Sequence, residues 1–312
     1  MLLWVLHLSM AVMLCGGVLT HFHEREGIIH LREGETTHEF LEETSGDAFV
    51  PVSLPFYLRL DKFGIDSLDD SARDYWSKVY VTDAHGTESS VISMNRPLFK
   101  AGYRIIQASY DEDLAGTHLA VIHDPWGTGI AVLGFVMFLL SAIGMLGQRL
   151  FTRSVGHTKV AAFSRHKILL GTVALVLVVL PLTPLFLAPL QPILRIPLLF
   201  IHVGTVILSY VLLVLSFQKR HLLMPAVLLL GIGIVLGALW GSISWGTYWS
   251  WDPKETWALV TLVLYAVPLH RRFLPKSFGS RCYLIYNVLC LMTLLMTYLG
   301  VNFFMESQHS YL

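Results

Sequence analysis

The sequence is poor in charge and in cysteine. Only 14% of its 312 residues are charged, and 22 basic residues balance 22 acidic ones. With no basic face to neutralise phosphates, nucleic acid is excluded as a partner. The three cysteines lie in apolar runs, and none is spaced as Cys-x-x-Cys. This excludes a disulfide framework and a thioredoxin-like dithiol, and it favours small buried side chains at these positions.

Long apolar runs take the place of the missing charge. Apolar residues make up 54% of the chain, which is typical of membrane proteins. A helix needs about 20 apolar residues to cross a bilayer. Seven segments are predicted to cross, the sixth being the shortest: Leu2–Thr20, Gly129–Gly147, Ile168–Leu187, Ile196–Phe217, Leu222–Gly241, Thr256–Leu269 and Cys282–Phe303. The first lacks a basic start and an Ala-x-Ala-like cleavage site, so we interpret it as a retained span rather than a secretory signal.

The distribution of lysine and arginine predicts the orientation. Basic residues gather in the loops after the second, fourth and sixth spans, which lie on one side of the membrane. The positive-inside rule makes that side cytoplasmic. We therefore expect segment 21–128, the tryptophan-rich loop and the C-terminus on the external face.

Residues 21–128 form the one long polar segment. Alternating side chains at 78–82 and 90–93 predict a hairpin, and 103–110 and 118–123 predict two further strands. The fold class is thus a polytopic α-helical membrane protein of about seven spans with a small external β-rich domain, of sandwich or open-barrel type. The expected organisation is a first span at 1–20, the β-rich domain at 21–128, a second span at 129–150 and a membrane domain at 151–312. We favour a spacer or docking role for the β-rich domain.

Five tryptophans fall within the eighteen residues from Trp240 to Trp257. One or two tryptophans at a membrane surface form the usual aromatic belt. A cluster interleaved with small residues favours a platform for a flat apolar ligand, and the loop 240–257 supplies it. The candidate platform residues are Trp245, Tyr248, Trp249, Trp251, Asp252 and Trp257. Asp252 also has a structural explanation, because with Pro253 and Glu255 it forms the capping signature of the next helix.

Four histidines fall in two tiers. His202 and His309 lie at the external side, whereas His7 and His270 lie at the cytoplasmic side. Imidazole is a good ligand for haem iron. Ionisable groups inside spans are rare and usually functional, which favours His7 and His202 as ligands. His270 beside two arginines also fits an interfacial cation, and His309 in a polar tail also fits a solvated side chain.

The loop then shows a family resemblance. Trp245-Gly-Thr-Tyr-Trp249-Ser-Trp251-Asp-Pro-Lys-Glu-Thr-Trp257 resembles the WWD signature of haem-handling proteins, and most closely that of CcsA (ResC) of system II cytochrome c synthase. The segment from Asn95 to Asp111 and the triplet His123-Asp-Pro125 resemble its partner, CcsB (ResB). The chain therefore looks like a compact fusion of both. Larger relatives have additional spans and a bigger external domain.

The resemblance implies a holocytochrome c synthase in the bacterial cytoplasmic (inner) membrane. It implies haem b as cofactor, with His202 and His309 as external iron ligands and His7 and His270 as transmembrane ligands. His21 and His23 are fallback candidates on the external side. Haem would cross the membrane and be presented in the periplasm to Cys-x-x-Cys-His of apocytochrome c, with thiol-reducing proteins as further partners. No general acid or base is assigned. The alternatives are a haem exporter or chaperone without ligase activity, and a membrane b-type redox protein.

Overall fold

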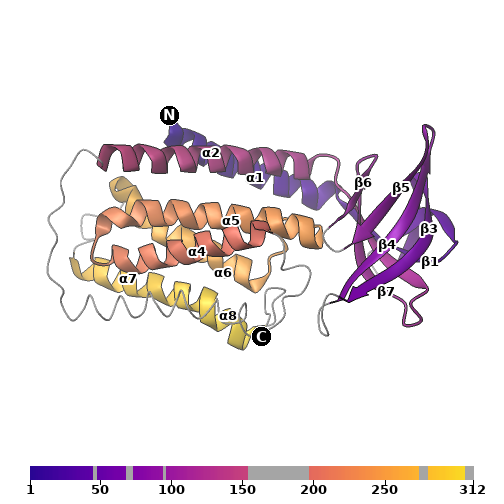
Figure 1. Cartoon of the computed structure of the whole chain (residues 1–312). Helices are drawn as coiled ribbons and strands as arrows, with labels where there is room; N and C mark the ends of the chain where they lie inside the picture. The colour runs from indigo at the N-terminus through magenta and orange to yellow at the C-terminus, as the bar shows by residue number, and fades with distance from the viewer. Residues whose placement is uncertain (45–47, 68–72, 94–95, 154–196, 274–279, 306–312) are drawn as a thin grey trace.

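The computed structural model describes residues 1–44, 48–67, 73–93, 96–153, 197–273 and 280–305. Two bodies are visible: a bundle of roughly parallel helices, and a curved β-sheet that lies across one end of it (Figure 1). This confirms a polytopic helical protein with a β-rich domain.

The described bundle contains long helices and short turns between them. Its elements are α1 (Leu2–His23), α2 (Gly127–Arg153), α4 (Pro197–Ser216), η2 (Arg220–Leu222), α5 (Leu223–Trp245), α6 (Pro253–Ala266), η3 (Val267–Phe273), α7 (Ser280–Leu295), η4 (Met296–Gly300) and α8 (Val301–Phe304). Among the described residues, five helical segments are long and apolar enough to cross a membrane, and they correspond to predicted spans one, two, four, five and seven. Predicted span 168–187 lies outside the described residues. The sixth is the short helix α6, which η3 continues.

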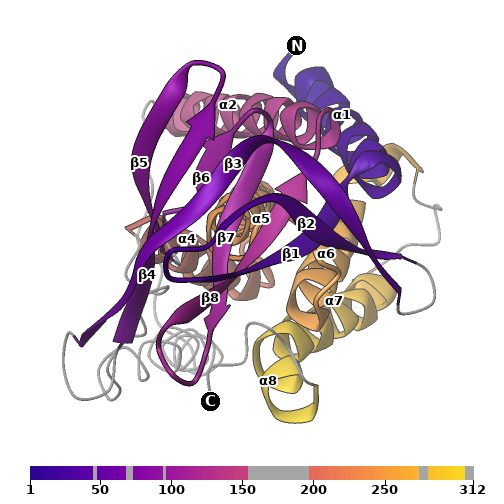
Figure 2. The same cartoon turned by 90° about the vertical axis from the view of Figure 1, so that its right-hand side faces the viewer.

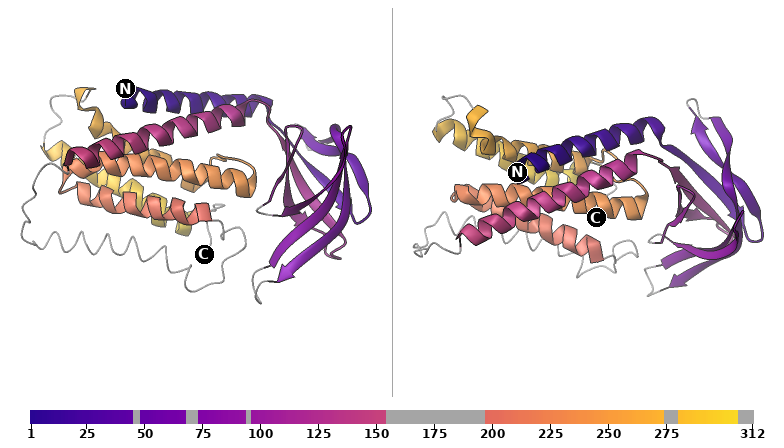
Figure 3. Two further views of the ribbon diagram at one scale, coloured as in Figure 1. Left: turned by 45° about the horizontal axis from the view of Figure 1, so that its top comes forward. Right: turned by 90° about the horizontal axis from the view of Figure 1, so that it is seen from above.

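The ends of the bundle are chemically different. The end of α2, η2 and η3 lie away from the sheet, whereas α5 ends and α6 begins next to the sheet (Figures 1 and 3). At the distal end, Arg149 Nη1 donates to the His221 carbonyl at 2.7 Å and ties α2 to η2. The described parts of the basic loops therefore share one end, and the tryptophan loop shares the other with the sheet. The assignment of the basic end to the cytoplasm stays a prediction.

Helices α1 and α2 pack with their backbones in close contact. A Cβ atom on Gly16 would lie 2.5 Å from the backbone nitrogen of Ala131, and one on Gly134 would lie 2.8 Å from that of Met13. Small residues allow this approach, and in lipid such van der Waals packing is a main source of helix association. The β-domain is inserted between these two helices in the sequence, so their pairing also brings its two ends together.

The β-domain is a single antiparallel sheet of eight strands. They are β1 (Arg25–Arg32), β2 (Thr36–Thr44), β3 (Ala48–Ser67), β4 (Arg73–Asp83), β5 (Gly86–Ser93), β6 (Leu98–Lys100), β7 (Tyr103–Tyr110) and β8 (Gly116–His123). Their order is β5-β4-β3-β2-β1-β8-β7-β6. The sheet curls until β5 contacts β6 and β7, which makes an open barrel (Figure 2). The predicted hairpin is β4–β5, and the two further predicted strands are β7 and β8.

The inward faces of the strands form one apolar core. Its fully enclosed side chains include Leu58, Leu60, Val79, Val81 and Leu119. In β3, Leu58 and Leu60 alternate with exposed or half-exposed neighbours, as expected for a sheet with one buried face. This core gives the domain its own rigidity at the end of the bundle.

The close contact of α1 with α2 predicts a sharp difference between two adjacent glycines. Gly16→Val should destabilise the protein by about 1–3 kcal/mol, because the added side chain collides with the α2 backbone. Gly17→Val should have little effect, since no atom lies within 4 Å of a Cβ at that position. Thermal unfolding of the two purified variants in detergent measures the difference. Equal losses in both variants would contradict the packing described here.

Candidate functional site

The tryptophan loop joins the C-terminus of α5 to the N-terminus of α6. Helix α5 ends at Gly246, which adopts a left-handed conformation with φ of 87°. Asp252 caps α6: its side chain is buried and accepts from the Lys254 backbone N–H at 2.9 Å, with Pro253 in the first turn. The predicted N-cap is confirmed. These two helix ends fix the points where the loop leaves and enters the bundle.

The first turn of α6 also holds the middle of the loop. Glu255 Oε2 accepts from the Ser250 backbone N–H at 2.9 Å, and Thr256 Oγ1 donates to the Trp251 carbonyl at 3.3 Å. Glu255 thus binds the backbone of a residue that precedes the N-cap residue Asp252 by two positions. Both hydrogen bonds use backbone groups of the loop. They therefore fix its backbone without using the indole side chains of the neighbouring tryptophans.

Trp251 is exposed on the loop, and the half-buried Trp249 lies beside it. Their rings meet edge to face with centroids 5.8 Å apart, and Trp251 is 69% exposed. Trp251 has a φ of 58°, a left-handed conformation that costs a bulky residue about 1–2 kcal/mol. A strained backbone that presents an indole to its surroundings is the kind of feature found at ligand sites. This part of the loop fits a platform for a flat apolar ligand.

Tyr248 points inward instead. Its hydroxyl lies 2.7 Å from Thr20 Oγ1 at the end of α1, and its ring meets Phe135 of α2 edge to face. Thr20 in turn donates to Asp124 Oδ2 at 2.8 Å. Tyr248 therefore anchors the loop to the α1–α2 pair. Of the remaining tryptophans, Trp240 is buried in α5 and Trp257 is half-buried on α6, whereas the side chain of Trp245 is outside the described set.

His202 lies on α4, within two turns of the end that faces the sheet. Its Nδ1 lies 2.7 Å from the carbonyl oxygen of Gly233 on α5. A carbonyl only accepts, so Nδ1 carries the proton and Nε2 keeps its lone pair. Metal-bound histidines commonly make this second hydrogen bond, because it fixes the tautomer and the ring orientation. His202 is thus prepared to act as a ligand through Nε2.

Two glycines of α5 allow α4 to approach closely, and one of them makes room for the His202 ring. A Cβ on Gly237 would lie 2.7 Å from His202 Cε1, and one on Gly233 would lie 2.6 Å from Val206 Cγ2. Helices α4 and α5 therefore meet along a small-residue stripe, Gly233-x-x-x-Gly237, in the way expected of membrane helices. The half-buried imidazole occupies the space that a side chain at Gly237 would fill.

His7 and His270 meet at the opposite end of the bundle. Their Nε2 atoms lie 3.5 Å apart, and their rings are perpendicular with centroids 5.7 Å apart. Each Nδ1 is bonded within its own segment, His7 to the Leu3 carbonyl at 2.7 Å and His270 to the Ala266 carbonyl at 3.0 Å. Both Nε2 atoms are consequently available and face each other. Two such nitrogens suit the axial positions of a haem iron.

The other candidate histidines are placed differently. His21 and His23 lie in the last turn of α1, about 20–24 Å from His7 at helical rise, so they cannot join the pair with His270. His309 lies outside the described residues, so its expected role beside His202 stays a prediction. The structure therefore brings one of the two predicted histidine pairs together.

The β-domain is attached to the loop through one buried guanidinium. Arg104 of β7 donates through Nη1 to the Ser242 carbonyl at 3.0 Å and through Nη2 to the Gly246 carbonyl. These are carbonyls of the last turn of α5, which have no partner within the helix and carry its negative dipole end. A Cβ on Gly246 would lie within 2.5 Å of Ile106 and Ile122, so the helix end rests directly on the sheet.

Acidic side chains surround this guanidinium. Burial, with the nearby charges of Glu26 and Asp124, raises the pKa of the Glu24 carboxyl to about 7, and attraction to Arg104 opposes the rise. Asp124 caps α2, accepting from the Gly127 backbone N–H at 2.8 Å. Burial acts to raise the pKa of its carboxyl, but hydrogen bonds from Thr128, Thr20 and the backbone together lower it. The junction is a partly desolvated charge cluster beneath the tryptophan loop.

Sequence reasoning did not single out Gly233, Gly237, Arg104 or Thr20. Arg104 and Asp124 stand inside the CcsB-like segments, but nothing in the sequence shows what they touch. The spacing of Gly233 and Gly237 on a predicted span was the available signal for a close helix contact.

Comparison with known proteins matches two separate parts of the chain to two families. Residues 216–309 match the cytochrome C assembly protein family, and residues 3–131 match the ResB-like family. The cytochrome c biogenesis protein CcsA of Guillardia theta is 50% identical over 84 residues, which are 27% of this chain and 27% of that protein. CcsA of Pyropia yezoensis is 48% identical over 97 residues, 31% of this chain and 29% of that protein. Protein NrfI of Wolinella succinogenes is 45% identical over 83 residues, 27% of this chain and 9% of that protein. The matched stretch spans less than a third of each of these relatives.

The His202 pocket predicts a strong effect of one methyl group. Gly237→Ala should weaken haem retention about tenfold or more, because the added Cβ displaces the imidazole from the Gly233 carbonyl. Gly204→Ala on α4 is the matched control, since its Cβ would meet nothing within 4 Å. The haem-to-protein ratio after purification measures the effect. A similar ratio in both variants would show that the pocket does not position a ligand.

The junction predicts a pH dependence of stability. The folded Glu24 carboxyl has a pKa of about 7, above its ordinary value of 4.5, so folding favours its protonated form. Its stabilising contribution is complete below pH 4.5 and is lost as the pH rises through 7. Glu24→Gln should therefore unfold at higher temperature than the native chain at pH 8, with no difference near pH 4.5. Glu112→Gln, at an exposed carboxyl of the turn after β7, is the control. A pH-independent difference for Glu24→Gln would refute the desolvation.

Proposed function

We propose that this chain carries haem b across a bacterial inner membrane and presents it for attachment to apocytochrome c. The premise is that the chain joins a ResB-like region to a cytochrome c assembly region, as fused system II proteins do. The His7–His270 pair is the observation that carries the proposal. One histidine comes from the ResB-like region and the other from the assembly region, so the pair exists only where both regions fold together.

The protonation and exposure of the two histidines at the inner site suit haem binding. Both rings donate Nδ1 to a carbonyl of their own segment and leave Nε2 free, and both are exposed at the bundle surface, where a flat apolar molecule reaches them from the lipid. Ionisable groups at this depth are costly unless they serve a purpose. We assign His7 and His270 as the two ligands at the basic, cytoplasmic end.

The outer site lies at the end that faces the β-domain. His202 supplies one imidazole, and Trp249 and Trp251 supply indole surface for the ring. We assign His309 of the C-terminal tail as the second external ligand. The Tyr248–Thr20 contact and the Arg104 contact fix the loop to the rest of the protein, so the platform keeps its place while haem is exchanged.

Attachment requires little from the protein beyond position. Each thiol of Cys-x-x-Cys-His adds across one vinyl group, the sulfur bonding to one carbon and the proton going to the other, so no oxidant or reductant is consumed. The substrate supplies the thiolates, and its histidine replaces a protein ligand on the iron. Holding the reacting groups together lowers the barrier by up to about 7–11 kcal/mol, because translational and rotational entropy is lost before the reaction and solvent need not reorganise. We therefore assign no general acid or base.

The proposal is tested by expression with an apocytochrome in cells that lack other maturation systems. The native chain should yield covalent haem that survives denaturing electrophoresis. His202→Ala should reduce the yield at least tenfold, and millimolar imidazole should restore part of it by filling the vacated ligand position. His221→Ala, another exposed histidine of the bundle, should retain full yield.

Two outcomes would count against the proposal. Haem that co-purifies while no covalent product forms would identify an exporter or chaperone instead of a synthase. Full haem content and full yield in His202→Ala, with no effect of imidazole, would remove the external-ligand assignment.

A further inference from the structure

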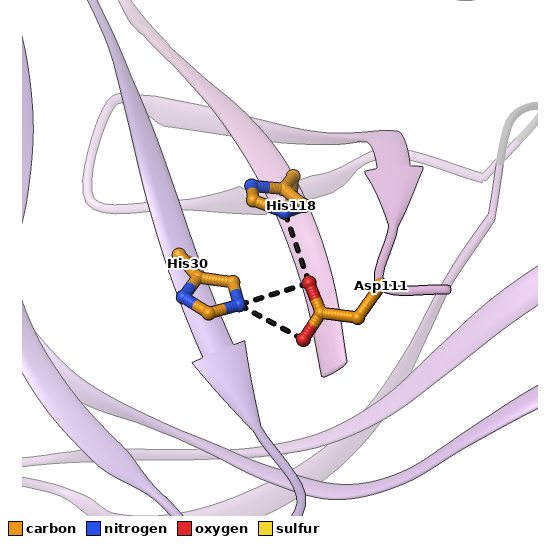
Figure 4. A group of neighbouring side chains, drawn as sticks. All are labelled: His30, Asp111 and His118. Atoms are coloured by element: carbon orange, nitrogen blue, oxygen red, sulfur yellow. Dashed lines mark hydrogen bonds and ion pairs between the residues drawn. The ribbon is translucent and has the colours of Figure 1, made fainter. Parts of the chain in front are cut away.

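A second group of potential ligands lies on the β-domain, outside the haem sites. His30 of β1 and His118 of β8 are direct partners in the antiparallel ladder, and their rings stack with centroids 4.5 Å apart and planes inclined by 19°. Asp111, immediately after β7, directs its carboxylate between them (Figure 4). Its Oδ1 lies 3.1 Å from Nε2 of both histidines. Strands β1 and β8 and the turn after β7 thus bring two nitrogens and one oxygen to a common point.

The carboxylate is held in place by its surroundings. The Asp111 side chain is only 15% exposed, and Arg32 Nη1 lies 3.2 Å from its Oδ2. A Cβ on Gly116 would lie 2.0 Å from that same oxygen, so only glycine leaves room for the carboxylate here.

The separations match those of metal ligands. A metal that binds nitrogen and oxygen at about 2.0–2.2 Å keeps neighbouring ligand atoms roughly 3–3.5 Å apart. The nitrogen-to-oxygen distances here are 3.0–3.1 Å, and all three ligand atoms lie within 4.8 Å of one another. Two imidazoles and one carboxylate form the ligand set of many sites for zinc and other first-row divalent ions.

We propose that His30, Asp111 and His118 bind a divalent transition-metal ion, with Zn²⁺ as the representative ion. The exposed side of His30 leaves a coordination position for water or for a group of a partner. The positive charge of Arg32 opposes a cation, but Asp113 pairs with Arg32 and offsets that charge. Arg32 also binds Oδ2, so Oδ1 remains directed at the histidines, as outer hydrogen bonds orient metal-binding carboxylates in other proteins.

The position of the site gives the ion a structural effect. Strand β1 continues from α1, and β8 leads into α2, so the ion would connect the two strands that carry the domain. It would also fix the turn after β7, the strand that holds Arg104 against α5. The site is separate from the tryptophan loop and does not depend on the haem assignments.

The test uses the full chain purified in detergent. After treatment with a chelator, the protein is incubated with excess Zn²⁺, exchanged into metal-free buffer and analysed by elemental mass spectrometry. The native chain should retain about one zinc per chain. His118→Gln and Asp111→Asn should retain none, with affinity in a chelator competition at least about 100-fold weaker.

A matched control separates the cluster from a surface histidine. His38 of β2 lies 3.6 Å from Glu39 without belonging to the His30–Asp111–His118 group, so His38→Gln should bind zinc as the native chain does. Circular dichroism and gel filtration establish that the variants fold. If they do not, a zinc-induced rise in the unfolding temperature of the native chain, reversed by chelator, still supports the proposal. No zinc on the native chain, or equal zinc on all variants, would overturn it and leave the cluster as an ion pair.

Discussion

The insertion of Arg104 into the C-terminal turn of α5 is the contact on which the arrangement of this protein depends. Helix α5 is the most enclosed of the described spans, and its last carbonyls need donors that lipid does not provide. The guanidinium supplies them from the β-domain. One side chain therefore satisfies the end of the central helix, fixes the sheet against the bundle and sets the point where the tryptophan loop begins.

Residues from both family regions meet at the candidate functional sites. The His7–His270 pair has one member in each region, and the loop of the assembly region is bound to the ResB-like region through Tyr248 and Thr20. A ligand site made from both parts is incomplete when either is misplaced. This gives a physical reason for joining the two in one chain, where the effective concentration of each part near the other is high.

Much of this structure follows from sequence patterns. Apolar runs located the described spans, alternation located β4, β5, β7 and β8, and the capping signature located the start of α6 at Asp252. The orientation of His202 could not be predicted, because it depends on how α4 and α5 slide against each other at Gly233 and Gly237. The meeting of His30 with His118 could not be predicted either, because strand pairing between distant segments leaves no local signal. The sequence pattern does not distinguish Tyr248, which faces inward, from Trp251, which faces outward.

The connection of β1 and β8 with α1 and α2 has a mechanical consequence. These two strands are hydrogen-bonded neighbours along their full length, and each runs almost directly into one of two helices packed backbone to backbone. Sheet and helix pair are therefore connected without a break from the barrel to the distal end of α1. A displacement of the barrel would act through this connection on the turn of α1 that carries His7, about 24 Å from the end of the helix at helical rise.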